Sequence, residues 1–193
     1  MREMISMIVV LTVFTAVSGG LLAAVKSKTE LRIENQVLKF QKAPAIKDLF
    51  PEATNDPLAE RFTIKSGDIE LQIFPGKLAD GSKTVAFETR GTGFGGAVGL
   101  MIGINLDSDE IVGARVTTHS ETPGIGARAK DDPSFVSQFA GMSLDTNFAV
   151  KGDGGDIDAM SGATVTSKAV CVAAAQAKKL YQSLKPEILK QIK

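Results

Sequence analysis

Tryptophan is absent from this chain of 193 residues, and tyrosine, cysteine and histidine each occur once. The single cysteine, Cys171, cannot form an internal disulfide, and one cysteine with one histidine cannot supply a Cys/His metal cluster. An iron–sulfur cluster held by this chain alone is excluded because the ligands are too few. We therefore expect no metal site, and any redox chemistry would need an organic or shared cofactor.

The chain also lacks an excess of charge of either sign. The 22 lysines and arginines balance the 22 aspartates and glutamates, so the formal net charge is zero. This charge gives no support for a nucleic-acid partner. The length suffices for one domain with a sizeable core and an appendage. The 19 glycines indicate many turns and close approaches of the backbone.

Charge is missing altogether from the segment between Met4 and Val25. A helix that spans a bilayer needs about 20 predominantly apolar residues, and this segment is of that length. A cleaved signal peptide is the alternative, but its apolar stretch is usually about 7–15 residues. We expect residues 1–27 to form an uncleaved transmembrane anchor in the lipid bilayer, followed by a helical connector over 28–60 and a folded domain over 61–193.

The charges that flank this segment say little about its orientation. Arg2 lies before it, and Lys26, Lys28 and Arg32 lie after it, which slightly favours a cytoplasmic C-terminal side. A single span without an ionisable residue cannot form an ion path by itself. Any ion translocation would therefore belong to partner subunits.

Hydrophobic periodicity beyond the anchor predicts an α+β domain with an antiparallel or mixed sheet flanked by helices. Helices are expected over 28–40, near 46–50, after Pro133 and from about Thr166 to Leu184, where Pro186 would end the last helix or start a final turn. The four residues 107–110, between two apolar runs, are typical of a hairpin turn. Strands are expected over Ile69–Phe74, Thr84–Arg90, Ala97–Leu106, Ile111–Thr118 and Asn147–Lys151.

One short run, Asp158-Ala-Met-Ser-Gly-Ala-Thr-Val-Thr-Ser167, places small residues and hydroxyls immediately before the last expected helix. Helix N-termini present unpaired N–H groups and a partial positive charge, and they therefore attract phosphate. The alternative is an ordinary helix start, and we expect Thr166 and Ser167 to cap the helix. Asp158 would then be a turn carboxylate, or a residue that an attaching enzyme recognises.

Two further segments carry unusual patterns. His119-Ser-Glu-Thr-Pro-Gly-Ile-Gly126 follows an expected strand and ends in a Pro-Gly turn, and Gly91-Thr-Gly-Phe-Gly-Gly-Ala-Val-Gly99 is glycine-rich and enters a strand. The glycine-rich segment lacks the lysine of a P-loop and the following helix of a dinucleotide fingerprint. Taken alone, these segments predict a tight turn and surface or capping side chains.

The Asp-x-x-Ser-Gly-Ala-Thr run and the His-x-Glu-Thr-Pro-Gly-x-Gly run together resemble the two hallmark motifs of the FMN-binding domain family. That family includes the G subunit of the Rnf electron-transport complex and the C subunit of the sodium-pumping NADH:quinone reductase. The motifs stand in the family's order, and with the anchor the resemblance covers almost the full chain. Because the chain lacks the long insertions of the C subunit, the resemblance favours the G subunit.

The resemblance implies that the domain over 61–193 carries FMN, attached by a phosphoester to the last threonine of the run, here Thr164. The implied site has no catalytic residue, and a carboxylate beside the flavin would accept a ring N–H hydrogen bond. The remaining cofactor-binding residues would be Ser161, Gly162, Ala163, Val165 and Thr166 around the attachment point, and Glu121, Thr122, Gly124 and Ile125 along the flavin.

The resemblance also implies a function: an electron-relay subunit of a membrane-bound, ion-translocating ferredoxin:NAD+ oxidoreductase (Rnf) complex. Its partners would be the other membrane subunits and a flavin transferase that attaches the FMN. The flavin domain would lie outside the cytoplasm, against the weak preference of the flanking charges. Three alternatives stay open: the C subunit of the sodium-pumping reductase, a stand-alone membrane-tethered flavin protein, and a binding module with loose or no flavin.

Overall fold

The computed structural model describes residues 2–66 and 69–192, and the chain divides into two compact units, Met1–Phe40 and Gln41–Lys193. The first unit is dominated by helix α1 (Arg2–Val37), none of whose residues is buried. Its most apolar window has a mean hydropathy of 2.3, so by length and composition the helix is able to cross a membrane. The helix expected over 28–40 begins within α1 as its direct continuation.

A π-helical turn, η1 (Leu38–Lys42), follows α1 and leads into α2 (Ala43–Leu49). A helix of 36 residues is about 54 Å long at 1.5 Å per residue, whereas the hydrocarbon core of a bilayer is about 30 Å thick. The apolar part of α1 is therefore long enough to cross a bilayer, and its charged part begins at Lys26.

The second unit is built on a five-stranded antiparallel sheet whose strands are ordered as in the sequence. This arrangement confirms the expected α+β class. The strands are β1 (Phe62–Ser66), β2 (Ile69–Lys77), β3 (Lys83–Thr92), β4 (Ala97–Asn105) and β5 (Ile111–Val116).

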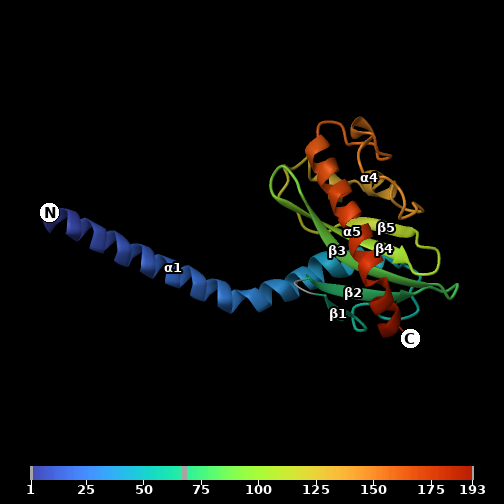
Figure 1. Cartoon of the computed structure of the whole chain (residues 1–193), viewed down its shortest axis with the longest axis horizontal. Helices are drawn as coiled ribbons and strands as arrows, with labels where there is room; N and C mark the ends of the chain where they lie inside the picture. Colours follow the sequence, from blue (N-terminus) through green and yellow to red (C-terminus); the bar gives the residue numbers. More distant parts are fainter. Residues whose placement is uncertain (1, 67–68, 193) are drawn as a thin grey trace. The chain divides into compact units, whose positions relative to one another are not determined.

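Helices cover both faces of this sheet because its central strands are apolar on both sides. The long helix α5 (Thr164–Gln191) lies across β3 and β4 (Figure 1) and packs on inward side chains such as Phe87 and Ile102. On the opposite face the ring of Phe50, which follows α2, lies against Gly103. Two short helices, α3 (Arg128–Asp131) and α4 (Pro133–Ser137), complete the core beside β5.

The observed secondary structure differs from the expected one in three places. Asn147–Lys151 forms no strand, and its one ladder contact is an isolated bridge between Val150 and Ile157. Strand β1 was not expected. Helix α5 begins at Thr164, close to the expected start. It continues beyond Leu184 through Pro186 to Gln191, because the buried side chains of its last turns, such as Ile188, hold it on the core.

Candidate functional site

A cavity of about 400 Å³ lies where the two motif segments and the glycine-rich turn meet. This volume falls within the range of about 300–1,000 Å³ that is usual for small-molecule sites. The glycine-rich segment is the turn of the β3–β4 hairpin, closed by a hydrogen bond from Gly93 N to Gly96 O of 2.7 Å. The cavity is lined by Phe94, Glu121, Thr122, Ile125, Gly126, Gly162, Ala163, Thr164, Val165 and Thr166.

The N-terminus of α5 forms one wall of this cavity. Thr164 is the first helical residue and is exposed. Within the described part of the chain, the backbone N–H groups of Thr164, Val165 and Thr166 have no hydrogen-bond acceptor, and the first paired N–H is that of Ser167. Gly162 has a φ of 76°, a left-handed conformation that favours glycine. Three free donors and the positive end of a 28-residue helix make this wall suited to an anionic group.

Glu121 joins the three segments at the base of the cavity. Its buried carboxylate accepts hydrogen bonds from Gly95 N at 2.7 Å, Phe94 N at 3.3 Å and the Thr166 hydroxyl. Burial opposes ionisation of this carboxyl, but the hydrogen bond from Thr166 and those from the two backbone N–H groups outweigh burial and lower its pKa from 4.5. These bonds occupy both carboxylate oxygens, so Glu121 holds the walls of the cavity together.

The expected capping role of Thr166 and Ser167 is wrong. The helix has no side-chain cap, and both residues lie inside its first turns. The Thr166 hydroxyl donates to Glu121, and Ser167 Oγ donates to Ala163 O and accepts from Met160 N, both at 3.0 Å. The hydroxyls therefore fasten the helix start to its surroundings, which leaves the first N–H groups open to the cavity.

Side chains from α3 and the end of α4 fix the backbone that precedes α5. Arg128 Nε donates to Ile125 O at 3.2 Å, and its Nη2 donates to Ser161 O. The amide of Gln138 forms two hydrogen bonds with the backbone of Asp158, at 2.8 and 3.2 Å. The Asp158 carboxylate pairs with Lys151 at 2.7 Å and is exposed. Asp158 thus orients the run through its backbone and leaves its carboxylate at the surface.

The structure brings most of the expected cofactor-binding residues together. Gly124, with a φ of 70°, and Ser161 do not line the cavity, although both belong to segments that do. Sequence reasoning did not single out Phe94, Gly126 or Arg128. An aromatic residue inside a glycine-rich turn was the available signal for Phe94, whereas the contacts of Arg128 have no signature in the sequence.

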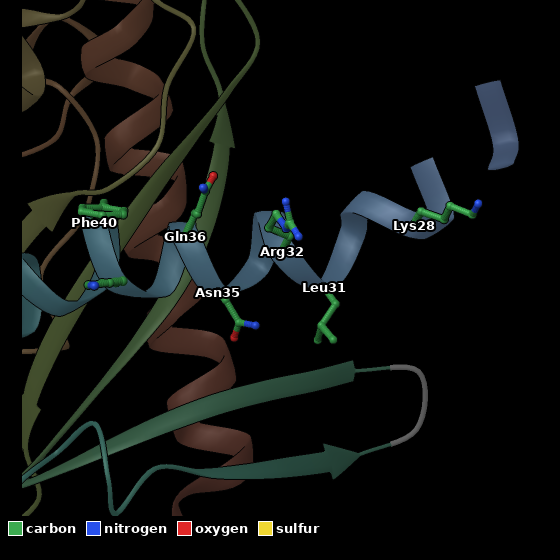
Figure 2. Close-up of a pocket in the computed structure, with 7 residues that line it drawn as sticks. Lys28, Leu31, Arg32, Asn35, Gln36 and Phe40 are labelled. Atoms are coloured by element: carbon green, nitrogen blue, oxygen red, sulfur yellow. The ribbon is translucent and has the colours of Figure 1, made fainter. Parts of the chain in front are cut away.

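Two other hollows do not make comparable sites. One of about 520 Å³ runs along the helix from Lys28 to Phe40. Every lining residue comes from this one helical segment, and Figure 2 shows Leu31 and Asn35 on one side of it and Arg32 on another. One helical segment has no opposite wall, so it cannot enclose a ligand. The second, near Lys47 and Arg115, is open and is lined mainly by charged side chains. No group of three or more potential metal-ligating side chains occurs among the residues that the structure describes.

Comparisons with known proteins identify the family to which the second unit is similar. Residues 93–179 match the family described as FMN-binding domain. The G subunit of the ion-translocating oxidoreductase complex of Cronobacter sakazakii is 34% identical over 190 residues, covering 93% of this chain and 91% of that protein. The G subunit of the same complex from Escherichia coli (strain K12) is 34% identical over 194 residues, covering 95% of this chain and 93% of that protein. The crystal structure of Shewanella oneidensis NqrC has a TM-score of 0.53 and 25% identity, covering 72% of this chain and 73% of that one.

Proposed function

This chain belongs to the family of G subunits of ion-translocating oxidoreductase complexes, and on that premise we propose that it carries one FMN, attached through its phosphate to Thr164. The observation that best supports attachment at Thr164 is the position of this residue. It is exposed at the start of α5, and it lines the cavity that the Glu121 segment and the glycine-rich turn also line. The phosphate and the ring of FMN each have a counterpart in this arrangement.

The phosphate of FMN fits the N-terminus of α5. The free N–H groups of Thr164, Val165 and Thr166 supply three donors, and the left-handed Gly162 has no Cβ to keep a ligand from the backbone. A phosphoester at Thr164 Oγ lies within the first turn of the helix, where its negative charge is favoured by the helix dipole. The ring of FMN would occupy the rest of the cavity. The exposed apolar side chains there are those of Phe94, Ile125 and Val165.

Attachment requires an activated nucleophile, because a threonine hydroxyl is weak without an adjacent base. We propose that a separate flavin transferase supplies that base and uses FAD as the donor. The bond from Thr164 Oγ to the flavin phosphorus forms, the pyrophosphate bond of FAD breaks, AMP leaves, and the hydroxyl proton passes to the transferase. The exposure of Thr164 and of the Asp158 carboxylate gives such an enzyme access to both.

The bound flavin would accept and release electrons singly or in pairs, which suits a relay between redox groups of neighbouring subunits. The chain itself contributes binding and orientation. The names of its relatives place them in an oxidoreductase complex, and the partners we propose are the other membrane subunits of such a complex. A tethered flavin cannot diffuse away from its site, which is an advantage outside the cytoplasm.

We propose further that α1 anchors the chain by a single span and that the flavin domain lies on the extracytoplasmic side. The uncharged length of α1 and its hydropathy support the span. The side rests on the family resemblance alone. Protease added to intact spheroplasts would cleave the second unit if it is extracytoplasmic and would leave it intact if it is cytoplasmic.

Fluorescence of the denatured protein tests the attachment. The full chain, expressed with a flavin transferase, is expected to give a fluorescent band after denaturing electrophoresis. Thr164→Ala should lose this band, whereas the matched hydroxyl deletion Ser161→Ala should keep it. A dark wild-type band, or a fluorescent Thr164→Ala band, would contradict covalent attachment at this residue.

Co-purification separates the relay subunit from a stand-alone flavin protein. The flavin-loaded chain, extracted in mild detergent from its own membrane, should bring other redox-active membrane subunits with it. If it is isolated alone with its flavin intact, the stand-alone alternative is supported instead.

A further inference from the structure

Lys168 is the only charged residue in the first two turns of α5, and it lies one helical turn beyond Thr164. Residues four apart in a helix are neighbours on its surface, and a helical side chain leans back towards the N-terminus. Both residues are exposed. The ammonium of Lys168 can therefore reach the space beside the Thr164 hydroxyl, although its own Cα belongs to the second turn.

Lys168 is paired with Asp153, the last residue of the short 3-10 helix η2 (Lys151–Asp153). The Lys168 Nζ lies 2.8 Å from Asp153 Oδ2 and 3.0 Å from Asp153 Oδ1. Each of the two side chains is 47% exposed, and an exposed ion pair contributes little to stability because water and salt screen it. The pair can therefore open when the lysine is offered a better acceptor.

Two other cations hold the segment that leads into α5, and both have partners. Arg128 donates to two backbone carbonyl oxygens, and Lys151 pairs with the Asp158 carboxylate at 2.7 Å. The first turn of the helix has no acidic side chain, and a cation near the positive end of a helix dipole is unfavourable unless an anion offsets it. Lys168 is thus the cation that an anion at this helix start would recruit.

We propose that Lys168 exchanges partners when the flavin is attached: its ammonium leaves Asp153 and pairs with the phosphate at Thr164. This inference rests on the proposed function, because it concerns the phosphate that joins the flavin to that threonine. The phosphate is a diester with a single negative charge, which one lysine neutralises. The free N–H groups of the first turn and the lysine then bind the same group. The loaded chain presents the Asp153 carboxylate without its counter-ion.

Replacing each member of the pair separates this exchange from a purely structural ion pair. Asp153→Asn frees the lysine, so attachment of the flavin should stabilise this variant more than it stabilises the wild type. Lys168→Gln removes the cation, so attachment should stabilise this variant less. Lys179→Gln, at an exposed lysine further along α5, is the matched control. A purely structural pair would change the stability of the empty and the loaded chain equally.

The measurement is the melting temperature of the full, flavin-loaded chain in detergent, minus that of the same chain without flavin. We expect this difference to rise in Asp153→Asn and to fall in Lys168→Gln, by roughly 2 °C in each case. Lys179→Gln and the charge-conserving Lys168→Arg should keep the wild-type difference. The phosphorus NMR signal of the loaded chain should shift in Lys168→Gln and stay in place in Lys179→Gln.

The outcomes separate this proposal from the function beneath it. A wild-type chain without flavin after denaturation refutes the attachment at Thr164. A loaded wild type refutes only the exchange if Asp153→Asn and Lys168→Gln change the temperature difference in the same direction or not at all, or if the phosphorus signal of Lys168→Gln is unshifted. If Lys168→Gln does not fold, Asp153→Asn still decides, because an unchanged or smaller difference in that variant overturns the proposal.

Discussion

The carboxylate of Glu121 accepts a hydrogen bond from the hydroxyl of Thr166, which lies 45 residues later in the chain. Both side chains are buried, with 6% and 2% of their surface exposed. The bond joins the segment after β5 to the first turn of α5, the turn that carries the free N–H groups. The two motifs therefore form one site because a buried polar contact holds them together.

This contact predicts a measurable coupling between the two residues. Glu121→Gln and Thr166→Val should each lower the free energy of unfolding by about 1–3 kcal/mol, because each leaves a buried polar group without its partner. The double variant should cost less than the sum of the two. Calorimetry of the detergent-solubilised chain gives the three differences, and simple additivity would show that the bond is not formed.

Glu121 also predicts a change of stability in acid. Its pKa is lowered in the folded chain from an ordinary value of 4.5, so the unfolded chain takes up the proton at a higher pH than the folded one. The stabilisation is therefore fully present above pH 4.5 and is lost as the pH falls through the lower, folded value. The stability difference between wild type and Glu121→Gln should shrink over that range, and a difference that is constant with pH would contradict this.

Arg128 should set how readily the attachment site is modified. Its guanidinium bridges the carbonyl oxygens of Ile125 and Ser161, and a lysine cannot donate in two directions from one planar group. We expect Arg128→Lys to slow the appearance of covalent flavin during incubation with transferase and FAD, without abolishing it. Arg90→Lys, at an exposed side chain on β3, is the control and should react at the wild-type rate.

The other end of α5 offers a prediction on stability alone. The Tyr181 hydroxyl donates to Asp109 Oδ1 at 2.6 Å, and Lys185 Nζ lies 2.5 Å from the same oxygen. Because a hydrogen bond to a charged group contributes about 1.5–3 kcal/mol, Tyr181→Phe should lower the melting temperature while the flavin content stays unchanged. Ser183→Ala, which alters an exposed hydroxyl on the same helix, should have little effect on either quantity.

Cys171 should be inert in the folded protein. Burial, followed by the charge of Asp153, raises the pKa of its thiol to about 11, and the thiolate is the reactive form. A disulfide reagent at pH 8 should therefore leave native chain unmodified and label it after denaturation. A Cys171→Ala chain carrying Ser161→Cys, at an exposed position, should react at once and confirm that the reagent is active.

Several elements could be predicted because their signals are local. The apolar length of α1, the hairpin at residues 107–110 and the proline start of α4, where Asp132 accepts from Ser134 N at 2.9 Å, each depend on neighbouring residues. The expected strand at 147–151 failed because a strand needs a partner, and Phe148 and Val150 are instead buried in the core without a continuous ladder. Pro186 did not end α5 because packing of the last turns outweighs its local cost of about 3 kcal/mol.

The sequence by itself determined the long apolar helix, the α+β class and the two motifs, because hydropathy, periodicity and spacing are properties of short segments. It placed Thr164 just before the expected helix and gave the resemblance that implied its role. Only the tertiary structure decided that the hydroxyl of Thr166 serves Glu121, that the glycine-rich turn is the third wall of the site, and that Phe94 stands at its rim. Those are contacts between residues far apart in the chain, and they are set by which buried groups can satisfy one another once the core has formed.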